Sequence, residues 1–213
     1  VFPNDADKGL TEEGIKLGRR LFYDPILSGD SSMSCATCHV QADGFSDKRQ
    51  FSIGINGSIG TRQAMPIINV AWMSKLFWDG REAGLEAQAL VPVEDHKEMN
   101  ADWLTVVEKL KKHPIYSVMF DDAFPGMEIT KELTANALVQ FEKTLISANS
   151  KFDLHEKGQY EYTASEQRGS DLFFSEQADC FHCHAGSLLL TDLEFHNNGL
   201  DAIPHDLGLE NFT

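Results

Sequence analysis

The sequence predicts an all-α fold in which long loops join the helices. One helix is expected between residues 130 and 147, because apolar residues recur there at helical spacing, at Leu133, Ala137, Leu138, Phe141 and Leu145. A second helix is expected over about residues 102–112, and it ends before the His113-Pro114 pair. Strand signals are few, and the Gly- and Ser-rich stretch at 56–60 is typical of a loop.

The pattern Cys-X-X-Cys-His occurs twice and uses all 4 cysteines, with Cys35, Cys38 and His39 in one copy and Cys180, Cys183 and His184 in the other. This pattern attaches a c-type haem. The two thiols form thioethers with the haem, and the histidine becomes the proximal ligand of the iron. A zinc site or structural disulfides are the alternatives, but neither requires a histidine after each pair. The motifs therefore predict two covalently bound haems, with His39 and His184 on the irons.

A short repeat precedes the two motifs. Residues 18–22 (GRRLF) come before the first and residues 169–173 (GSDLF) before the second. Each run is expected on a short helix, and Thr163 and Glu166 have the spacing of a capping box. In each run, the glycine is expected to let a neighbouring helix approach, and the Leu-Phe pair to face the haem. Duplication of a cytochrome-c-like haem domain explains the repeat.

The expected domains are residues 1–160 and residues 161–213. The second domain is expected to be truncated, because the residues after His184 are few and rich in turn signals. No methionine follows Met127, so the second haem has no methionine ligand in its own domain. His196 and His205 are either ligands of that haem or ordinary loop histidines.

Composition limits the partners. The formal net charge is −15 over 213 residues, which argues against nucleic acid and anionic membranes as partners. This charge either attracts a basic redox partner or only keeps the protein soluble. No apolar run approaches the ~18 residues of a membrane span. Because covalent haem attachment of this kind takes place in exported proteins, a periplasmic location is expected.

Six stretches of the chain together resemble the bacterial dihaem cytochrome c peroxidases, a family whose motifs the MauG-like enzymes share. They are residues 21–30 (LFYDPILSGD), 34–39 (SCATCH), 77–81 (FWDGR), 85–89 (LEAQA), 98–100 (EMN) and 195–199 (FHNNG). The resemblance covers nearly the whole chain. It implies that the first haem reacts with hydrogen peroxide and that the second receives electrons from a small cytochrome c or copper protein.

The resemblance also implies roles for single residues. Glu98 would be the distal acid–base residue, Gln88 would lie beside it, and Trp78 would carry electrons between the haems. A calcium ion and a homodimer are expected on the same ground. Ile55 departs from the family pattern, because many members have there a histidine that blocks the first iron. Gln63 departs from it as well, because it stands where an asparagine binds calcium.

The residues themselves leave alternatives open. A carboxylate above a haem can move a proton between the two oxygens of peroxide. Without the resemblance, however, a glutamate in such a charged stretch is more often a solvated loop charge. His96 is a rival acid–base group. Gln88 could instead be a helix-surface residue, and Trp78 could instead be a core aromatic. Trp72 and Trp103 are expected to be core aromatics.

Arg81 is a candidate for binding a haem propionate through a charge-assisted pair. A surface ion pair with Asp79 or Glu82 is its alternative.

Three functions follow from these observations. The first is a peroxidase that reduces hydrogen peroxide to water with electrons from a small redox protein. The second is a MauG-like oxidase that acts on a protein substrate. The third is a dihaem electron carrier, which would have two strong axial ligands on each iron.

Overall fold

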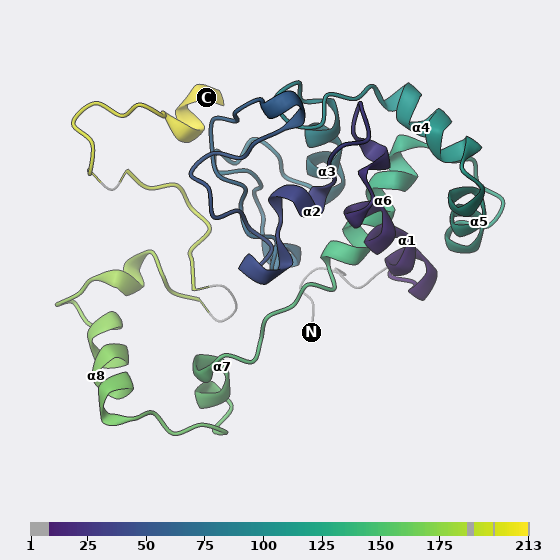
Figure 1. Ribbon diagram of the computed structural model, residues 1–213. Coiled ribbons are helices and arrows are strands. Elements are labelled where there is room, and N and C mark those ends of the chain that lie inside the picture. Colours follow the sequence, from purple (N-terminus) through teal and green to yellow (C-terminus); the bar gives the residue numbers. More distant parts are fainter. Residues whose placement is uncertain (1–8, 187–189, 198, 213) are drawn as a thin grey trace. The chain divides into compact units, whose positions relative to one another are not determined.

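The computed structural model describes residues 9–186, 190–197 and 199–212, and they are almost entirely helices and loops (Figure 1). Three isolated bridges, each closing a loop, pair Val40 with Ser46, Ile53 with Ile59 and Leu76 with Glu82, and the described residues contain no longer strand. The predicted all-α class is therefore confirmed.

The chain forms two compact units, of which one comprises Val1–Leu145 with Gly208–Thr213 and the other Ile146–Leu207. The helices of the first unit are α1 (Glu12–Tyr23), α2 (Cys35–Cys38), α3 (Leu85–Glu94), α4 (Trp103–Lys112), α5 (Pro114–Ala123) and α6 (Lys131–Glu142). The second unit contains α7 (Lys151–Glu156) and α8 (Ala164–Phe173). Short 3-10 turns are η2 (Pro25–Leu27), η3 (Gln41–Asp43), η4 (Ile55–Gly57), η5 (Val70–Trp72), η6 (Cys180–His182) and η7 (Gly208–Phe212). The expected domain division at residue 160 stays a prediction.

The core of the first unit is built around the pair α1 and α6 (Figure 1). The backbone N–H of Thr11, which caps α1, donates a hydrogen bond of 2.9 Å to Oε1 of Gln140 on α6. A Cβ atom at Gly18 would overlap the carbonyl oxygen of Ala137, so only glycine permits this approach. Leu17, Leu21 and Phe22 of α1 are fully buried against α6.

The sequence repeat predicts that its second glycine, Gly169, also lets a neighbouring helix approach, and this prediction is wrong. A Cβ atom at Gly169 in α8 would meet nothing within 4 Å among the described residues. Among the described residues, no helix packs against α8 at this glycine.

Two helix boundaries differ from the sequence prediction. Helix α6 ends at Glu142 rather than near residue 147, because Thr144 and Leu145 turn back onto the last carbonyl groups with hydrogen bonds of 2.9 and 3.0 Å. Helix α4 ends at Lys112 as predicted, but α5 begins at once with Pro114 in its first turn. Proline is favoured there because the first N–H groups of a helix have no partner within it.

The second unit is small and loosely packed. Its capping box is confirmed, since the N–H of Thr163 donates to Oε2 of Glu166 at 2.9 Å and the N–H of Glu166 donates to Oγ1 of Thr163 at 3.3 Å. Large apolar side chains nevertheless stay exposed, among them Leu172 and Phe174. Among the described residues, no helix has the length and apolar character needed to cross a membrane.

Candidate haem-attachment sites

The first Cys-X-X-Cys-His motif folds as one helical turn. Cys35 and Cys38 bound α2, the N–H of Ser34 donates to Oγ1 of Thr37 at 3.0 Å, and the N–H of His39 donates to the carbonyl of Cys35 at 2.9 Å. Residues three apart on a helix lie on one face, so both thiols are presented together. Neither thiol is in a disulfide. Burial raises the pKa of the Cys35 thiol to about 12, and the carboxylates of Glu142 and Glu98 add to this shift.

The ring of His39 is oriented for metal binding through one nitrogen. Its Nδ1 lies 3.2 Å from the carbonyl oxygen of Phe45. Because a carbonyl only accepts hydrogen bonds, Nδ1 carries the hydrogen and Nε2 keeps its lone pair. Burial lowers the pKa of His39, which favours the neutral ring that a metal requires. Metal-ligating histidines commonly donate their other ring N–H in this way.

The second motif repeats this geometry. Nδ1 of His184 lies 3.2 Å from the carbonyl oxygen of Leu190, again six residues later in the chain. Phe45 and Leu190 both have a left-handed backbone, with φ angles of 55° and 51°. The N–H of His184 donates to the carbonyl of Cys180 at 2.9 Å, as the N–H of His39 does to Cys35. The residues of both motifs therefore fit covalent attachment of a haem with the histidine as ligand.

The phenylalanines of the sequence repeat also take equivalent places. The ring of Phe22 is 6.5 Å from that of His39 with an angle of 43° between the planes, and the ring of Phe173 is 6.3 Å from that of His184 with an angle of 42°. The two motifs thus share their surroundings as well as their sequence pattern.

The loop at residues 53–55 connects the first motif with the segment that carries Glu98. The N–H of Ile55 donates to the carbonyl of Glu98 at 2.8 Å, and a Cβ atom at Gly54 would overlap the carbonyl of Lys97. On the other side, the Cys38 thiol lies 3.9 Å from the carbonyl oxygen of Ile53. Glu98, in the loop between α3 and α4, is therefore held close to the first motif.

The carboxyl group of Glu98 is half-buried. Burial raises its pKa to about 6, Asp95 adds to the shift and Arg81 opposes it. Such a group is ionised at neutral pH yet accepts a proton easily, as an acid–base catalyst must. The rival His96 is highly exposed on the same loop, with its Nδ1 3.7 Å from Asp95.

The other predicted residues lie in the first unit in different environments. Ile55 is buried in the hydrophobic core. Gln88 is half-buried on α3. The side chain of Trp78 is 49% exposed, and its Nε1 donates to the carbonyl of Gln63 at 2.9 Å, while the amide nitrogen of Gln63 donates to the carbonyl of Asp47. Trp103 is buried, as expected for a packing residue.

Arg81 forms an ion pair with Asp79 at 2.7 Å, which is one of the alternatives considered for it, and its guanidinium lies 3.5 Å from the centre of the Phe77 ring. Arg62 pairs with the same carboxylate. Asp79 is buried, which by itself would raise its pKa, but the hydrogen bonds from Arg62 and Arg81 lower it overall. A guanidinium can also form a charge-assisted pair with an anionic group such as a haem propionate.

Sequence reasoning missed Glu142. Its side chain is buried on α6, and burial raises its pKa to about 8, with a further contribution from Glu86. The sequence signal that could have revealed Glu142 is its position on the apolar stripe of the helix, four residues after Leu138, where a charged residue is unexpected.

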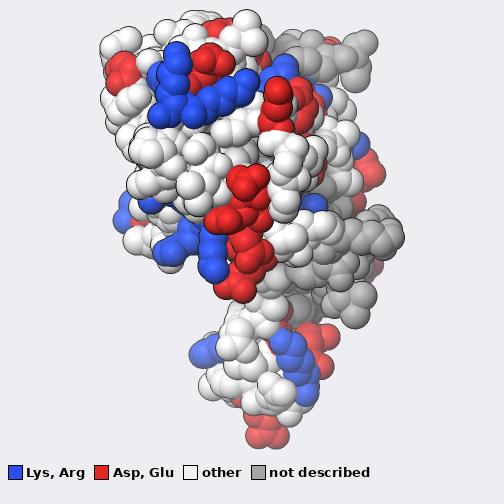
Figure 2. Space-filling model, turned by 90° about the vertical axis from the view of Figure 1, so that its right-hand side faces the viewer, with Lys and Arg blue, Asp and Glu red and all other residues white. Residues whose placement is uncertain are grey.

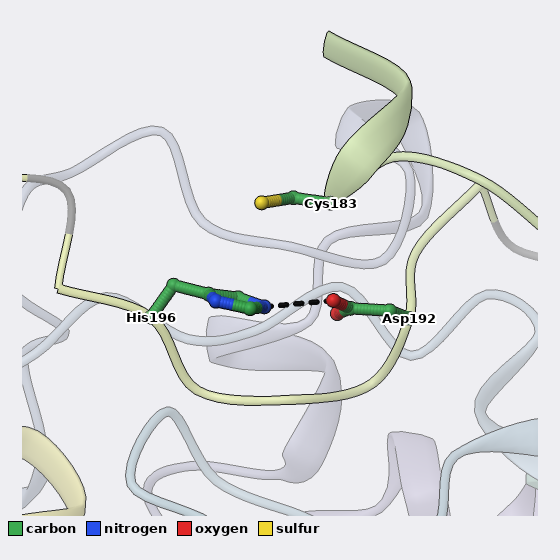
Figure 3. Close-up of side chains that lie close together, drawn as sticks. All are labelled: Cys183, Asp192 and His196. Carbon is green, nitrogen blue, oxygen red and sulfur yellow. Dashed lines mark hydrogen bonds and ion pairs between the residues drawn. The ribbon is translucent and has the colours of Figure 1, made fainter. Parts of the chain in front are cut away.

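Two groups of side chains in the second unit could hold a metal ion. In Figure 3, the thiol of Cys183 lies beside His196, whose Nε2 is 2.7 Å from Oδ2 of Asp192. The other group is Glu176, Asp179 and His182, all exposed. In each group the ligand atoms lie within 4.8 Å of one another. The first group includes a cysteine of the second motif, so His196 lies at that motif, while His205 lies in an exposed loop.

Charges of both signs are mixed on the surface. On the face drawn in Figure 2, Lys and Arg side chains lie next to Asp and Glu side chains and form no single basic surface. This agrees with the net charge of −15.

Comparison with known proteins agrees with the geometry. The family model of the di-haem cytochrome c peroxidases matches residues 12–161. The methylamine utilization protein MauG of Methylorubrum extorquens is 37% identical over 213 residues, which are 99% of this chain and 60% of that protein. The cytochrome c peroxidase Ccp of Escherichia coli is 36% identical over 189 residues, covering 88% of this chain and 39% of that protein.

Solved structures give the same result. A MauG-like protein associated with microbial copper homeostasis superimposes with a TM-score of 0.88 at 33% identity, over 97% of this chain and 66% of that one. The diheme peroxidase BthA of Burkholderia thailandensis matches with a TM-score of 0.74 at 24% identity, over 88% of this chain and 51% of that one, and shares the fold. The chain thus spans about 60% of the first curated relatives that it matches. It belongs to the di-haem cytochrome c peroxidase family, which includes the MauG proteins.

Proposed function

We propose that this chain carries two covalently bound c-type haems and acts in the reduction of hydrogen peroxide to water. Electrons come from a small redox protein, a cytochrome c or a copper protein, and enter at the second haem. The observation that carries the proposal is the half-buried Glu98, with a pKa raised to about 6 by burial, on a segment bonded to the loop beside Cys38. The membership in a family of di-haem peroxidases supports it.

The roles of the residues follow from this proposal. Cys35 and Cys38 would hold the first haem and Cys180 and Cys183 the second, while His39 and His184 would be the iron ligands. A bound haem supplies the iron centre at which the O–O bond is cleaved with two electrons and two protons, giving two molecules of water. Glu98 would move a proton from one oxygen of peroxide to the other, and the half-buried Gln88 would donate a hydrogen bond to peroxide.

Two further residues serve the haems. Trp78 relays electrons toward the first haem, and its hydrogen bond of 2.9 Å to the carbonyl of Gln63 fixes the indole for this task. Arg81 binds a haem propionate through a charge-assisted pair, while Asp79 holds its guanidinium at 2.7 Å.

The test is the reaction of the fully loaded protein with hydrogen peroxide in a stopped-flow spectrometer. Glu98→Gln is expected to lower the rate about 10²–10⁴-fold, since it removes the acid–base group. Glu94→Gln, an exposed carboxylate at the end of α3, is the matched control and keeps the wild-type rate. Wild-type turnover in Glu98→Gln would remove Glu98 from the mechanism.

A MauG-like oxidase acting on a protein substrate is the second candidate. Ile55 favours it, because a buried isoleucine cannot block the first iron in any redox state. The 37% identity to a MauG protein favours it as well. Peroxide added with a candidate protein substrate and no small electron donor distinguishes the two, since only the oxidase leaves oxidised residues on that protein. An electron carrier, the third function considered, would not react with peroxide.

Location and assembly complete the proposal. The protein works in the periplasm, because haem is attached to such motifs in exported proteins. It binds one calcium ion and forms a homodimer, as the family resemblance implies. Calcium is tested by chelation followed by metal analysis, and the dimer by the mass of the protein in solution.

A further inference from the structure

An aromatic pair links His39 to the protein surface. Phe22 is fully buried, and its ring lies 6.5 Å from that of His39. On its other side, the Tyr23 ring lies 5.1 Å away in an edge-on arrangement at 72°. The Tyr23 side chain is 39% exposed. Three rings in successive contact thus run from the candidate iron ligand to solvent, at spacings typical of packed aromatic pairs.

The second unit repeats this path with one chemical difference. The rings of Phe173 and His184 are 6.3 Å apart, and those of Phe173 and Phe174 are 4.9 Å apart, also at 72°. Phe174 therefore occupies the place of Tyr23. A phenol gives up an electron far more readily than a phenyl ring, because the departing hydroxyl proton stabilises the radical. The described structure thus has a redox-active end on the first path and an inert end on the second.

The surroundings of Tyr23 suit electron and proton exchange with solvent. Its hydroxyl donates a hydrogen bond of 3.0 Å to Oε1 of Gln41. The ring lines a shallow surface hollow of about 560 Å³, whose other lining residues are Lys16, Arg19, Arg20, Asp24 and Pro25. Water reaches the hydroxyl there, and a small reductant can approach the ring.

We infer that Tyr23 is a surface redox residue through which oxidising equivalents left at the first haem escape when no protein donor is bound. The inference rests on the proposed reaction with peroxide. Tyr23 loses one electron, which passes by way of Phe22 and His39 to the haem and reduces it by one equivalent. The O–H bond breaks at the same time, the proton goes to water, and a phenoxyl radical remains. A small organic reductant such as hydroquinone returns one hydrogen atom and restores the phenol.

The test mixes the loaded protein with hydrogen peroxide without a donor and freezes it for electron paramagnetic resonance. Wild type is expected to give a tyrosyl radical, and Tyr23→Phe to lose most of it. Tyr162→Phe, a tyrosine of the second unit, is the control and keeps the signal. Mass spectrometry provides a second readout, since oxidised product is expected on the peptide that contains Tyr23. Phe174→Tyr is expected to add a second oxidised peptide.

Each outcome decides the inference. If Tyr23→Phe gives the wild-type radical while peroxide is still consumed, Tyr23 has no such role and the proposed peroxidase stands. If peroxide changes neither the optical spectrum nor the peroxide concentration, both proposals fail. If Tyr23→Phe does not fold, ring-deuterated or fluorinated tyrosine at position 23 replaces it. A radical spectrum that such labelling leaves unchanged would also overturn the inference.

Discussion

Nδ1 of His39 lies 3.2 Å from the carbonyl oxygen of Phe45, and this contact decides which ring nitrogen is left for a metal. The left-handed backbone at Phe45, with a φ angle of 55°, turns that carbonyl toward the ring. His184 and Leu190 repeat both features in the second unit. Two motifs that share this detail are expected to hold the same kind of group.

The haem content of the protein follows from these motifs. Wild type is expected to carry two haems that survive denaturation, because thioether bonds are covalent. The double change Cys180→Ala with Cys183→Ala is expected to leave one haem. Intact-mass measurement under denaturing conditions counts the attached haems. An unmodified wild-type mass after expression with haem-maturation machinery would exclude covalent attachment.

The two glycines of the sequence repeat are expected to respond in opposite ways to alanine. Gly18→Ala places a methyl group against the carbonyl of Ala137 and is expected to destabilise the protein by about 1–3 kcal/mol. Gly169→Ala meets open space within a helix and is expected to stabilise its unit by about 0.5–1 kcal/mol. Urea unfolding measures both. Equal effects would mean that α1 and α6 do not approach each other so closely.

Glu142 makes stability depend on pH. Its pKa is about 8 in the folded protein, mainly through burial, against an ordinary value of 4.5. The folded state therefore binds the Glu142 proton more tightly than the unfolded state does. The contribution of Glu142 to the stability of the folded protein is thus complete below about pH 4.5 and is lost as the pH rises to about 8. Glu142→Gln is expected to remove roughly 2–5 kcal/mol of this loss.

Urea unfolding of wild type and Glu142→Gln across this pH range measures the effect. Glu86→Gln is a useful comparison, because Glu86 is exposed and contributes to the shift only as a neighbouring charge. Parallel pH profiles for wild type and Glu142→Gln would show that Glu142 is not protonated in the folded protein.

Asp79 holds two arginines together. Its carboxylate is buried and pairs with both Arg62 and Arg81, so Asp79→Ala removes a shared ion pair from two guanidinium groups. A loss of roughly 3 kcal/mol in unfolding free energy is expected. Glu12→Gln removes the exposed partner of Lys16 and serves as a control with little effect. Equal stability of the two variants would mean that the Asp79 cluster contributes nothing.

Much of the site could be predicted from local sequence. The Cys-X-X-Cys-His motifs, the Thr163–Glu166 capping box and the end of α4 at Lys112 depend on residues only a few positions apart. The sequence repeat also predicted equivalent places for Phe22 and Phe173, and their rings lie at similar distances, 6.5 and 6.3 Å, from His39 and His184. That they face the haem stays a prediction.

Features that depend on distant residues could not be predicted in this way. Gly18 and Gly169 occupy the same place in the repeat, but only Gly18 has a helix packed against it. The raised pKa values of Glu98 and Glu142 come from burial, which is set by the tertiary fold. The His113-Pro114 pair predicts the end of one helix, but its second role at the start of α5 depends on the turn that the chain makes there.

Electron paramagnetic resonance of the fully oxidised protein tests most simply whether the first iron is open to peroxide. Ile55 is buried in the core and offers no ligand atom, so one haem is expected to give a high-spin ferric signal before any reduction. Two purely low-spin haems would mean that both irons are capped, and this would contradict a first haem that is open to peroxide.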